Sequence, residues 1–477
     1  MLARHSLTYF VARAVPALLS VASLIAFTRL ATPAEYGKFT VLLATIGFAN
    51  AGLFWWLRFG LLRFLPGFDG DRRIFLATIA QAFIAVVLIT IPLAFLLRLT
   101  TAPATTGWLF GAGIALLWTQ AAFDLVQEIA RSDFSPIRFG VLALARAALF
   151  LGFGIALLLL DFGATGLWLA LMLALLAPTI VSGWSAFRGV RLRLADPQLF
   201  RRLAAYGMPL AAASGLNVVI DSSDRLIIAA LLDTESAGVY SAGYELTQRT
   251  LVVVMNVVYL ASFPLVMRAF EQNGAEAARE QLATNQSLLI GVGLPCVTAV
   301  ALLSTEITSM LFGEQYLRAT AIVPWIAGGV FLQGMRSYHA DLSFQLAGQT
   351  VRLTLIAVAA VGLNVGFNFL WIPIYGIAGA AYATVVSYAA ALVLSWSFGN
   401  RAFRLPRLGL TDLKTLAATA GMAAILLLDR PASGAVTLVA HVALALVVFG
   451  LIHALLNTGN IRGRLRHWMV AQGARNE

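Results

Sequence analysis

The chain has 477 residues, of which 60% are apolar and 12% are charged, whereas soluble proteins are about 45 to 50% apolar and ~25% charged. This composition excludes an ordinary soluble enzyme and indicates a polytopic membrane protein. Lysine and arginine together outnumber the acids by 33 to 22, for a net charge of +11. In a soluble domain such an excess would raise nucleic-acid binding, so the location of the basic residues decides its meaning.

Apolar runs of about 20 residues, the length needed to cross a bilayer core, recur along the whole chain. They predict about 14 transmembrane helices. The expected spans lie near residues 9–30, 38–60, 74–98, 107–130, 139–160, 166–186, 206–231, 238–263, 284–305, 319–340, 353–372, 377–399, 413–429 and 434–456. The predicted fold class is therefore an all-α polytopic membrane protein.

Basic residues are distributed unequally between the loops on the two sides of these spans. With a cytoplasmic N-terminus, the inner segments hold 22 of the 33 lysines and arginines and the outer loops hold 4. Cytoplasmic loops are enriched in Lys and Arg, so both termini are predicted to be cytoplasmic. The basic excess then reports membrane orientation, and no nucleic-acid partner is expected.

Two pairs of loops on the same membrane side resemble each other. Residues 28–40 (TRLATPAEYGKFT) align with 229–241 (AALLDTESAGVYS) at a shift of 201, which pairs Gly37 with Gly238. Residues 161–170 (DFGATGLWLA) align with 374–383 (IYGIAGAAYA) at a shift of 213, which pairs Gly163 with Gly376. Two similar shifts predict a parallel duplication of six helices, and two such lobes are a recurrent transporter architecture.

The duplication predicts four segments in the chain. An N-terminal six-helix lobe covers residues 1–187, and a cytoplasmic linker covers 188–205. A C-terminal six-helix lobe covers 206–400, and residues 401–477 add two transmembrane helices and a basic cytoplasmic tail. A substrate would pass between the two lobes.

Charged residues inside predicted spans are costly and mark functional sites or ion pairs. In the second lobe, Asp221 and Arg225 are four residues apart, as are Glu245 and Arg249, and Asp224 adds a third acid. Such i, i+4 spacing fits internal ion pairs. It also fits arginines that face a wet cavity, and the sequence leaves both interpretations open.

The first lobe has its own intramembrane charges. Asp124 and Glu128 share one helix face, at a depth similar to that of Arg58 and Arg146. Mutual pairing and a proton-linked carboxylate are the two interpretations. Arg29 lies close enough to a span end to reach the interface, as an anchor or a gate residue.

Several kinds of site are not indicated. No Walker-type phosphate loop is present, and the scattered histidines show no metal-ligand spacing, so neither a cofactor nor a metal is predicted. His339, beside Arg336 and Asp341, fits a satisfied interface residue better than a proton relay. No outer loop is long enough for a sizeable catalytic domain. No catalytic residue is proposed, and the chain is not expected to be an enzyme.

Residues 200–246 resemble the polysaccharide-biosynthesis exporters, the Wzx-type O-antigen and lipid-linked oligosaccharide flippases of the multidrug/oligosaccharidyl-lipid/polysaccharide (MOP) superfamily. The resemblance rests on YGMPL (206–210), DRLII (224–228) and GVYS (238–241), with supporting stretches at 29–39, 310–319 and 372–384. It implies two six-helix lobes that open alternately to the two sides of the membrane.

The resemblance also implies a cationic cavity for the diphosphate of a polyprenol-linked sugar, lined by helices one, two, seven and eight. Carried onto this sequence, the substrate-binding residues are Arg29, Arg58, Arg225 and Arg249. The ion-coupling or supporting residues are Asp124, Asp221, Asp224 and Glu245. Arginine suits a diphosphate because its planar donors match phosphate oxygens in pairs.

The expected function is a flippase that moves a lipid-linked oligosaccharide to the outer leaflet for surface polysaccharide, such as lipopolysaccharide or exopolysaccharide. An ion gradient or the membrane potential would drive it. The expected location is the bacterial inner membrane, and a polysaccharide polymerase and assembly proteins are expected partners. The alternative is a small-molecule or drug exporter of similar two-lobe architecture. A membrane enzyme such as a polysaccharide polymerase is a third interpretation.

Overall fold

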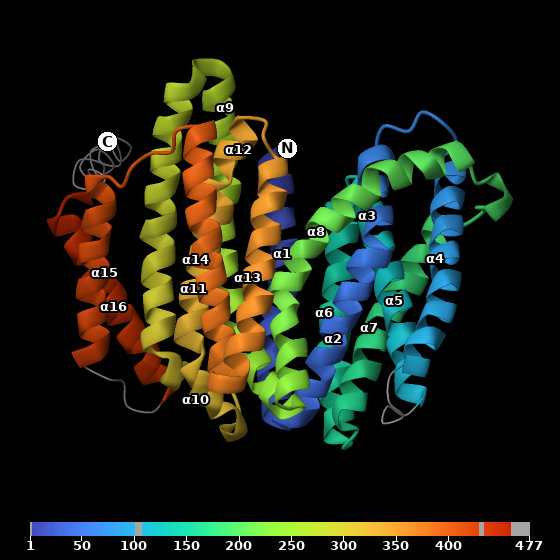
Figure 1. Cartoon of the computed structure of the whole chain (residues 1–477), viewed down its shortest axis with the longest axis horizontal. Helices are drawn as coiled ribbons and strands as arrows, with labels where there is room; N and C mark the ends of the chain where they lie inside the picture. Colours follow the sequence, from blue (N-terminus) through green and yellow to red (C-terminus); the bar gives the residue numbers. More distant parts are fainter. Residues whose placement is uncertain (1, 101–106, 429–433, 459–477) are drawn as a thin grey trace, which may run out of the picture. The chain divides into compact units, whose positions relative to one another are not determined.

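The computed structural model describes residues 2–100, 107–428 and 434–458, and all regular elements in these ranges are helical (Figure 1). The first half of the chain forms α1 (Leu2–Leu30), α2 (Pro33–Leu53), α3 (Trp55–Phe64), α4 (Arg72–Thr100), α5 (Gly107–Ser132), α6 (Pro136–Leu159), α7 (Gly163–Phe187) and α8 (Pro197–Leu231). The second half forms α9 (Thr234–Leu302), α10 (Ser304–Leu311), α11 (Val323–Met335), α12 (Leu342–Leu346), α13 (Val351–Tyr375), α14 (Ile377–Ala402), α15 (Leu410–Leu428) and α16 (Ala435–Leu455). The all-α prediction is confirmed.

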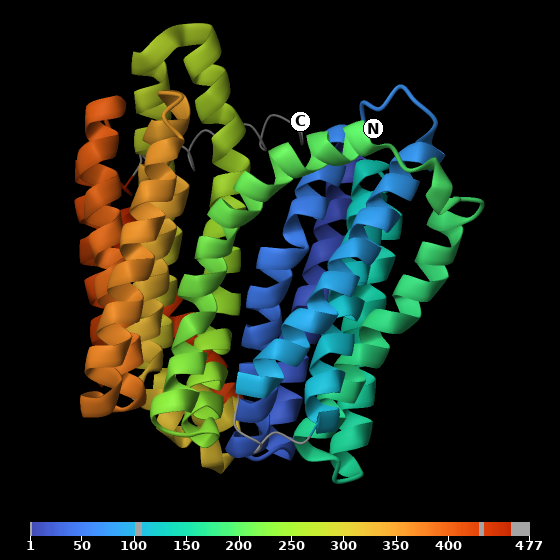
Figure 2. The same cartoon turned by 45° about the vertical axis from the view of Figure 1, so that its right-hand side comes forward.

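Within the described ranges, nine helices are long and apolar enough to cross a membrane, or ten if α2 and α3, which are bent by 50°, form one span. The 69-residue α9 contains two of the predicted spans and a non-helical residue at Gly274. Both views show α9 reversing its direction near its middle (Figures 1 and 2). The chain is thus a multi-pass membrane protein, and the count of 14 spans stays a prediction.

The chain divides into two compact units, which we call unit 1 (Met1–Ser241) and unit 2 (Ala242–Glu477). This division places α8 with the helices of the first half, and the boundary falls inside α9. The predicted lobes at 1–187 and 206–400 remain predictions. The predicted basic tail extends over residues 459–477, which lie outside the described residues.

The second half of the predicted linker is helical. Helix α8 begins at Pro197 rather than near residue 206, and the Asp196 side chain caps it by accepting a hydrogen bond from the Gln198 N–H at 2.8 Å. Leu199 and Leu203 are buried, which explains why this basic segment folds onto unit 1. Figure 2 shows α8 bent along its length, and the helix contains Pro209, whose ring removes a backbone donor.

Local sequence signals explain where α2 begins. Thr32 precedes Pro33 at the first helical position, and Glu35 follows as the third helical residue. The Glu35 N–H donates to the Thr32 hydroxyl at 3.3 Å, and the Thr32 N–H donates to Glu35 Oε2 at 2.9 Å. This capping box satisfies two otherwise unpaired backbone donors and fixes the start of the helix.

The start of α2 packs against the start of α9, and the contact is reciprocal. A methyl group at Gly37 would lie 1.7 Å from the backbone oxygen of Thr234, and one at Gly238 would lie 2.0 Å from that of Pro33. The Ser241 hydroxyl donates to the Thr40 hydroxyl at 3.0 Å. Gly37 and Gly238, Pro33 and Thr234, and Thr40 and Ser241 are each 201 residues apart, which is the shift of the sequence alignment, so residues that the alignment pairs make reciprocal contacts. Only glycine permits this backbone approach.

The second predicted match is also visible in the backbone. Gly163 and Gly376, which the shift of 213 pairs, have left-handed φ values of 51° and 59°. Gly163 opens α7 and Gly376 immediately precedes α14, so each allows a tight turn into the next helix. A positive φ thus occurs at both glycines that the predicted duplication pairs.

One buried acid attaches the last two helices to the rest of unit 2. Asp412, at the start of α15, accepts hydrogen bonds from Gln286 Nε2 at 2.8 Å and Ser287 Oγ at 2.6 Å on α9, and from the Gly409 N–H at 2.8 Å. Its exposed fraction is 2%. Three donors compensate the buried carboxylate, which therefore fixes α15 on α9.

We expect Asp412→Ala to lower the thermal unfolding temperature because Gln286 and Ser287 would lose their buried acceptor, at a cost of about 1 to 3 kcal/mol for each unsatisfied group. Unfolding is measured by the reaction of a thiol dye with Cys296, the single cysteine of the chain. Asp412→Asn, which keeps one acceptor oxygen, should fall between wild type and Asp412→Ala. Equal melting of all three would contradict the role of Asp412.

Candidate functional site

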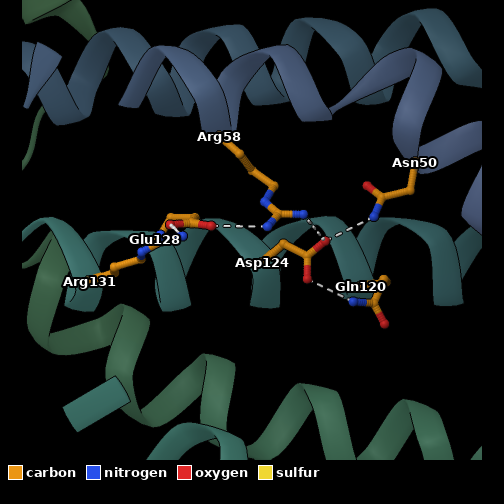
Figure 3. Close-up of polar contacts among 6 residues, drawn as sticks. All are labelled: Asn50, Arg58, Gln120, Asp124, Glu128 and Arg131. Carbon is orange, nitrogen blue, oxygen red and sulfur yellow. Dashed lines mark hydrogen bonds and ion pairs between the residues drawn. The ribbon is translucent and has the colours of Figure 1, made fainter. Parts of the chain in front are cut away.

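Unit 1 contains a cluster of charged and amide side chains that joins α2 and α3 to α5 (Figure 3). Arg58 on α3 donates from Nη2 to Glu128 Oε1 at 3.0 Å, and its Nη1 lies 3.5 Å from Asp124 Oδ2. Asp124 and Glu128 point to the same side of α5, as their spacing predicts. One guanidinium therefore bridges both acids, and pairing is the interpretation that this structure bears out for Arg58.

Two amides complete the hydrogen bonding of Asp124. Asn50 Nδ2 donates to Asp124 Oδ2 at 2.9 Å, and Gln120 Nε2 donates to Asp124 Oδ1 at 2.8 Å (Figure 3). Neither amide was a predicted site residue. Gln120 is detectable in hindsight because it lies one turn before Asp124 on the same helix, whereas Asn50 comes from α2, whose bend into α3 the sequence does not show.

The cluster is electrically balanced. Arg131, one turn after Glu128, places Nη1 3.6 Å from Glu128 Oε2, so the group contains two cations and two anions. The Asp124 and Glu128 side chains are about nine-tenths buried, while Arg58 is 29% exposed and lies 5.5 Å from the Trp55 ring. An anionic ligand of Arg58 would thus compete with two carboxylates, unless a cation or proton neutralises one of them.

Further basic residues surround the far end of α5. Arg72 at the start of α4 lies 2.7 Å from Asp133, and Arg138 on α6 lies 3.9 Å from the same carboxylate. Arg72 and Arg138 are more exposed than Arg58. They follow the inner-segment pattern of the sequence and connect α4, the α5 end and α6.

The predicted residues of α8 and α9 fall in both units. Glu245 and Arg249 form an ion pair at 2.6 Å in unit 2, which confirms the geometric part of the i, i+4 prediction. In unit 1, Asp224 is buried and accepts a hydrogen bond from the Tyr240 hydroxyl. Tyr240 was not predicted as a site residue, although it belongs to the GVYS stretch.

The remaining predicted residues lie on α1 and α8. Arg29 is exposed in the last turn of α1, while Asp221 and Arg225 are half-buried on α8. The structure thus brings Arg58 together with Asp124, and Arg249 together with Glu245. Substrate binding by Arg29, Arg58, Arg225 and Arg249 stays a prediction, as does the supporting role of the four acids.

The described part of unit 1 also has an apolar pocket, and none of these charged residues lines it. It has a volume of about 250 Å³ and is lined by side chains of α4, α5 and α7, including Phe83, Val126 and Phe187. Among the residues that the structure describes, no group of three or more His, Cys, Asp or Glu is arranged to hold a metal ion.

The chain matches a known protein family. The sequence profile of a family described as polysaccharide biosynthesis protein matches residues 73–321, more than half of the chain. A probable low-salt glycan biosynthesis flippase, Agl15 of Haloferax volcanii, is 27% identical over 36% of this chain and 36% of its own length. The uncharacterized membrane protein YabM of Bacillus subtilis is 24% identical over 40% and 37%. The chain thus matches little more than a third of the length of each of these relatives.

Solved structures show the fold over nearly the whole chain. The lipid II flippase MurJ, in an inward closed conformation, has a TM-score of 0.74 at 14% identity, covering 95% of this chain and 99% of its own. An inward-facing multidrug resistance MATE family transporter of the MOP superfamily has a TM-score of 0.64 at 13% identity, covering 82% and 97%.

A MOP superfamily transporter from Pyrococcus furiosus has a TM-score of 0.55 at 15% identity, covering 84% of this chain and 94% of its own. The relatives and neighbours whose names state a role are flippases and transporters rather than enzymes. The chain therefore belongs to the polysaccharide biosynthesis protein family and has the fold of the MOP superfamily of transporters.

Proposed function

We propose that this protein is a flippase that moves a polyprenyl-diphosphate-linked oligosaccharide from the cytoplasmic to the outer leaflet for surface polysaccharide synthesis. The observation that carries the proposal is the family match over residues 73–321, because that family serves polysaccharide biosynthesis. The fold likeness to a lipid II flippase over 95% of the chain supports it. The proposed location is a bacterial inner membrane, with both termini cytoplasmic and with a polymerase and assembly proteins as partners.

In the proposed mechanism, alternating access exposes the headgroup site to one side of the membrane at a time, and an ion gradient or the membrane potential drives the cycle. Arg29, Arg58, Arg225 and Arg249 bind the diphosphate, and Asp124, Asp221, Asp224 and Glu245 position them or couple an ion. Guanidinium groups suit this task because they donate paired hydrogen bonds to phosphate oxygens. The saccharide crosses in the wet cavity while the polyprenyl chain stays in the bilayer.

A drug exporter is the second candidate, because MATE transporters share the fold. Proteoliposomes that contain only this protein separate the two functions. A fluorescent lipid-linked oligosaccharide should become accessible to an external sugar-modifying reagent if the protein is a flippase. Export of cationic dyes without leaflet exchange would support the exporter. Elongation of the saccharide chain, with neither dye export nor leaflet exchange, would support a polymerase.

We expect Arg225→Ala and Arg249→Ala each to reduce leaflet exchange at least tenfold, because one charge-assisted contact to a diphosphate contributes about 1.5 to 3 kcal/mol. The measurement is the initial rate of leaflet exchange at equal amounts of folded protein. Arg188→Ala, which removes an exposed charge after α7, serves as the control and should keep the wild-type rate.

The pairing of Arg249 with Glu245 calls for a second comparison. If Arg249 only neutralises Glu245, the double variant Glu245→Gln/Arg249→Gln should regain wild-type exchange, since no charge is then left alone. If Arg249 binds the diphosphate, the double variant should stay inactive. Wild-type exchange by both single variants would remove the two arginines from the mechanism.

A further inference from the structure

Unit 2 contains a buried polar group that the proposed transport site does not use. It surrounds a π-helical turn, Arg336–Ala340, between α11 and α12, where the Asp341 N–H donates to the Arg336 carbonyl at 2.9 Å. Its side chains are those of Arg336, His339 and Asp341. The exposed fraction is 0% for His339 and 7% for Arg336. Single π-helical turns within helices are rare and are often found at functional sites.

The hydrogen bonding of this group is incomplete. Asp341 accepts a hydrogen bond from Ser395 on α14, and its Oδ2 lies 3.5 Å from Arg336 Nε. Apart from this ion pair, Arg336 Nε and Nη1 make no hydrogen bond, and neither ring nitrogen of His339 has a hydrogen-bond partner in the described structure. The His339 ring lies 5.6 Å from the Trp396 ring instead. Buried polar atoms without partners are costly, so burying His339 in this arrangement lowers the free energy of unfolding of unit 2.

The charged and titratable groups around His339 come from four elements. The π-helical turn and its end supply Arg336, Tyr338 and Asp341, and α14 supplies no ionisable side chain at this point, only Ser395 and Trp396. On α9, Asn285 donates to the Tyr338 carbonyl, and Tyr259 packs on the Tyr338 ring. On α15, the buried Asp412 binds Gln286 of α9, the residue after Asn285. The set therefore has two carboxylates and one arginine, and one further positive charge would balance it.

The present packing does not accommodate that charge on His339. An imidazolium has two N–H donors and needs two acceptors, whereas neither ring nitrogen has an acceptor here. Proton binding and this packing of unit 2 therefore oppose each other. A ligand that binds one of two arrangements better shifts the population toward that arrangement. A π-helical turn provides a second arrangement, because a shift by one residue turns the following side chains by about 100°.

We propose that His339 is a proton-binding site that couples a proton to the movement of unit 2. The neutral imidazole accepts one proton from the aqueous phase and becomes an imidazolium, and no other bond changes. The π-helical turn shifts its register in this step, and Asp341 accepts one of the two imidazolium N–H groups. Release of the proton restores the packing described above. The coupling to transport rests on the proposed flippase function, whereas proton binding by His339 does not.

The first experiment measures the site without transport. Amide hydrogen exchange of residues 336–346 is followed in nanodiscs at pH 5 and pH 8, with correction for the intrinsic pH dependence of exchange. We expect severalfold faster corrected exchange at pH 5 in the wild type and no difference in His339→Gln. His441→Gln, which removes a half-buried histidine of α16, should behave as wild type. Equal corrected exchange at both pH values in the wild type would overturn the proposal, even if no variant folds.

The second experiment measures leaflet exchange in proteoliposomes with and without a pH gradient. We expect the gradient to accelerate the wild type and His441→Gln severalfold, and to have no effect on His339→Gln, which should retain the rate seen without a gradient. A full gradient response in His339→Gln would overturn the coupling. If the wild type exchanges no lipid-linked oligosaccharide at all, the flippase function fails, and the hydrogen-exchange result still decides whether His339 binds a proton.

Discussion

Among Gly→Ala substitutions in the helices of unit 1, Gly37→Ala is expected to destabilise the protein most. The new carbon would lie 1.7 Å from the Thr234 carbonyl oxygen and 2.9 Å from the Gly238 nitrogen. Both are backbone atoms, so relief requires the starts of α2 and α9 to separate. Overpacking of side chains costs about 1 to 3 kcal/mol, and we expect a clash with backbone to reach or exceed the upper end of that range.

The same helix offers a matched control for this prediction. Gly52 on α2 has no atom within 4 Å of an added methyl group, so Gly52→Ala should be neutral or stabilising, because Ala favours a helix over Gly by about 1 kcal/mol. Gly238→Ala should reproduce the defect of Gly37→Ala, since its methyl group would lie 2.0 Å from the Pro33 oxygen. Thermal unfolding followed at Cys296 measures all three. Equal melting of Gly37→Ala and Gly52→Ala would show that the two helix starts do not need their close approach.

Arg58→Leu should have the second large effect. The substitution leaves Asp124 and Glu128 without their shared counterion, and removing one partner from a buried ion pair costs about 3 to 5 kcal/mol. We expect a strong loss of folded protein in detergent, measured by size-exclusion chromatography and thermal unfolding. Arg63→Leu, which removes an exposed arginine from the same helix, is the control and should fold normally.

Neutralising the acids separates a structural role of Arg58 from a binding role. In Arg58→Leu/Asp124→Asn/Glu128→Gln the cluster holds no uncompensated acid, so folding should recover. Leaflet exchange by this triple variant then reports on Arg58 as a ligand of the diphosphate. Recovery of folding without exchange supports substrate binding, whereas recovery of both shows that the cluster only joins α3 to α5. Failure to recover folding would contradict the electrostatic explanation.

Much of the helical architecture could be predicted because its signals are local. Apolar runs locate the helices, and Thr32 with Glu35 forms the capping box that their spacing allows. The ion pair of Glu245 with Arg249 also follows from i, i+4 spacing on one helix. Such interactions depend on one helical repeat and on no distant part of the chain.

The rest depends on contacts between helices, which spacing does not reveal. Arg58 reaches Asp124 and Glu128 because α2 bends by 50° into α3, and no proline marks that bend. The hydrogen bond from Tyr240 to Asp224 joins two helices across a short turn. Helix α8 begins nine residues before the predicted span near residue 206, because Arg201 and Arg202 make this segment polar while Leu199 and Leu203 supply its buried contacts.

The reciprocal packing of Gly37 and Gly238 has the form of an isologous interface, in which residue i of one copy meets residue j of the other and the converse also holds. In a single chain this geometry is expected when a gene for a homodimer fuses with its own copy. In a homodimer, one mutation changes both sides of such a contact. In a fused chain, each side can change separately. Pro33 and Thr234 show the result, because the two equivalent positions now hold different residues around the same glycine crossing.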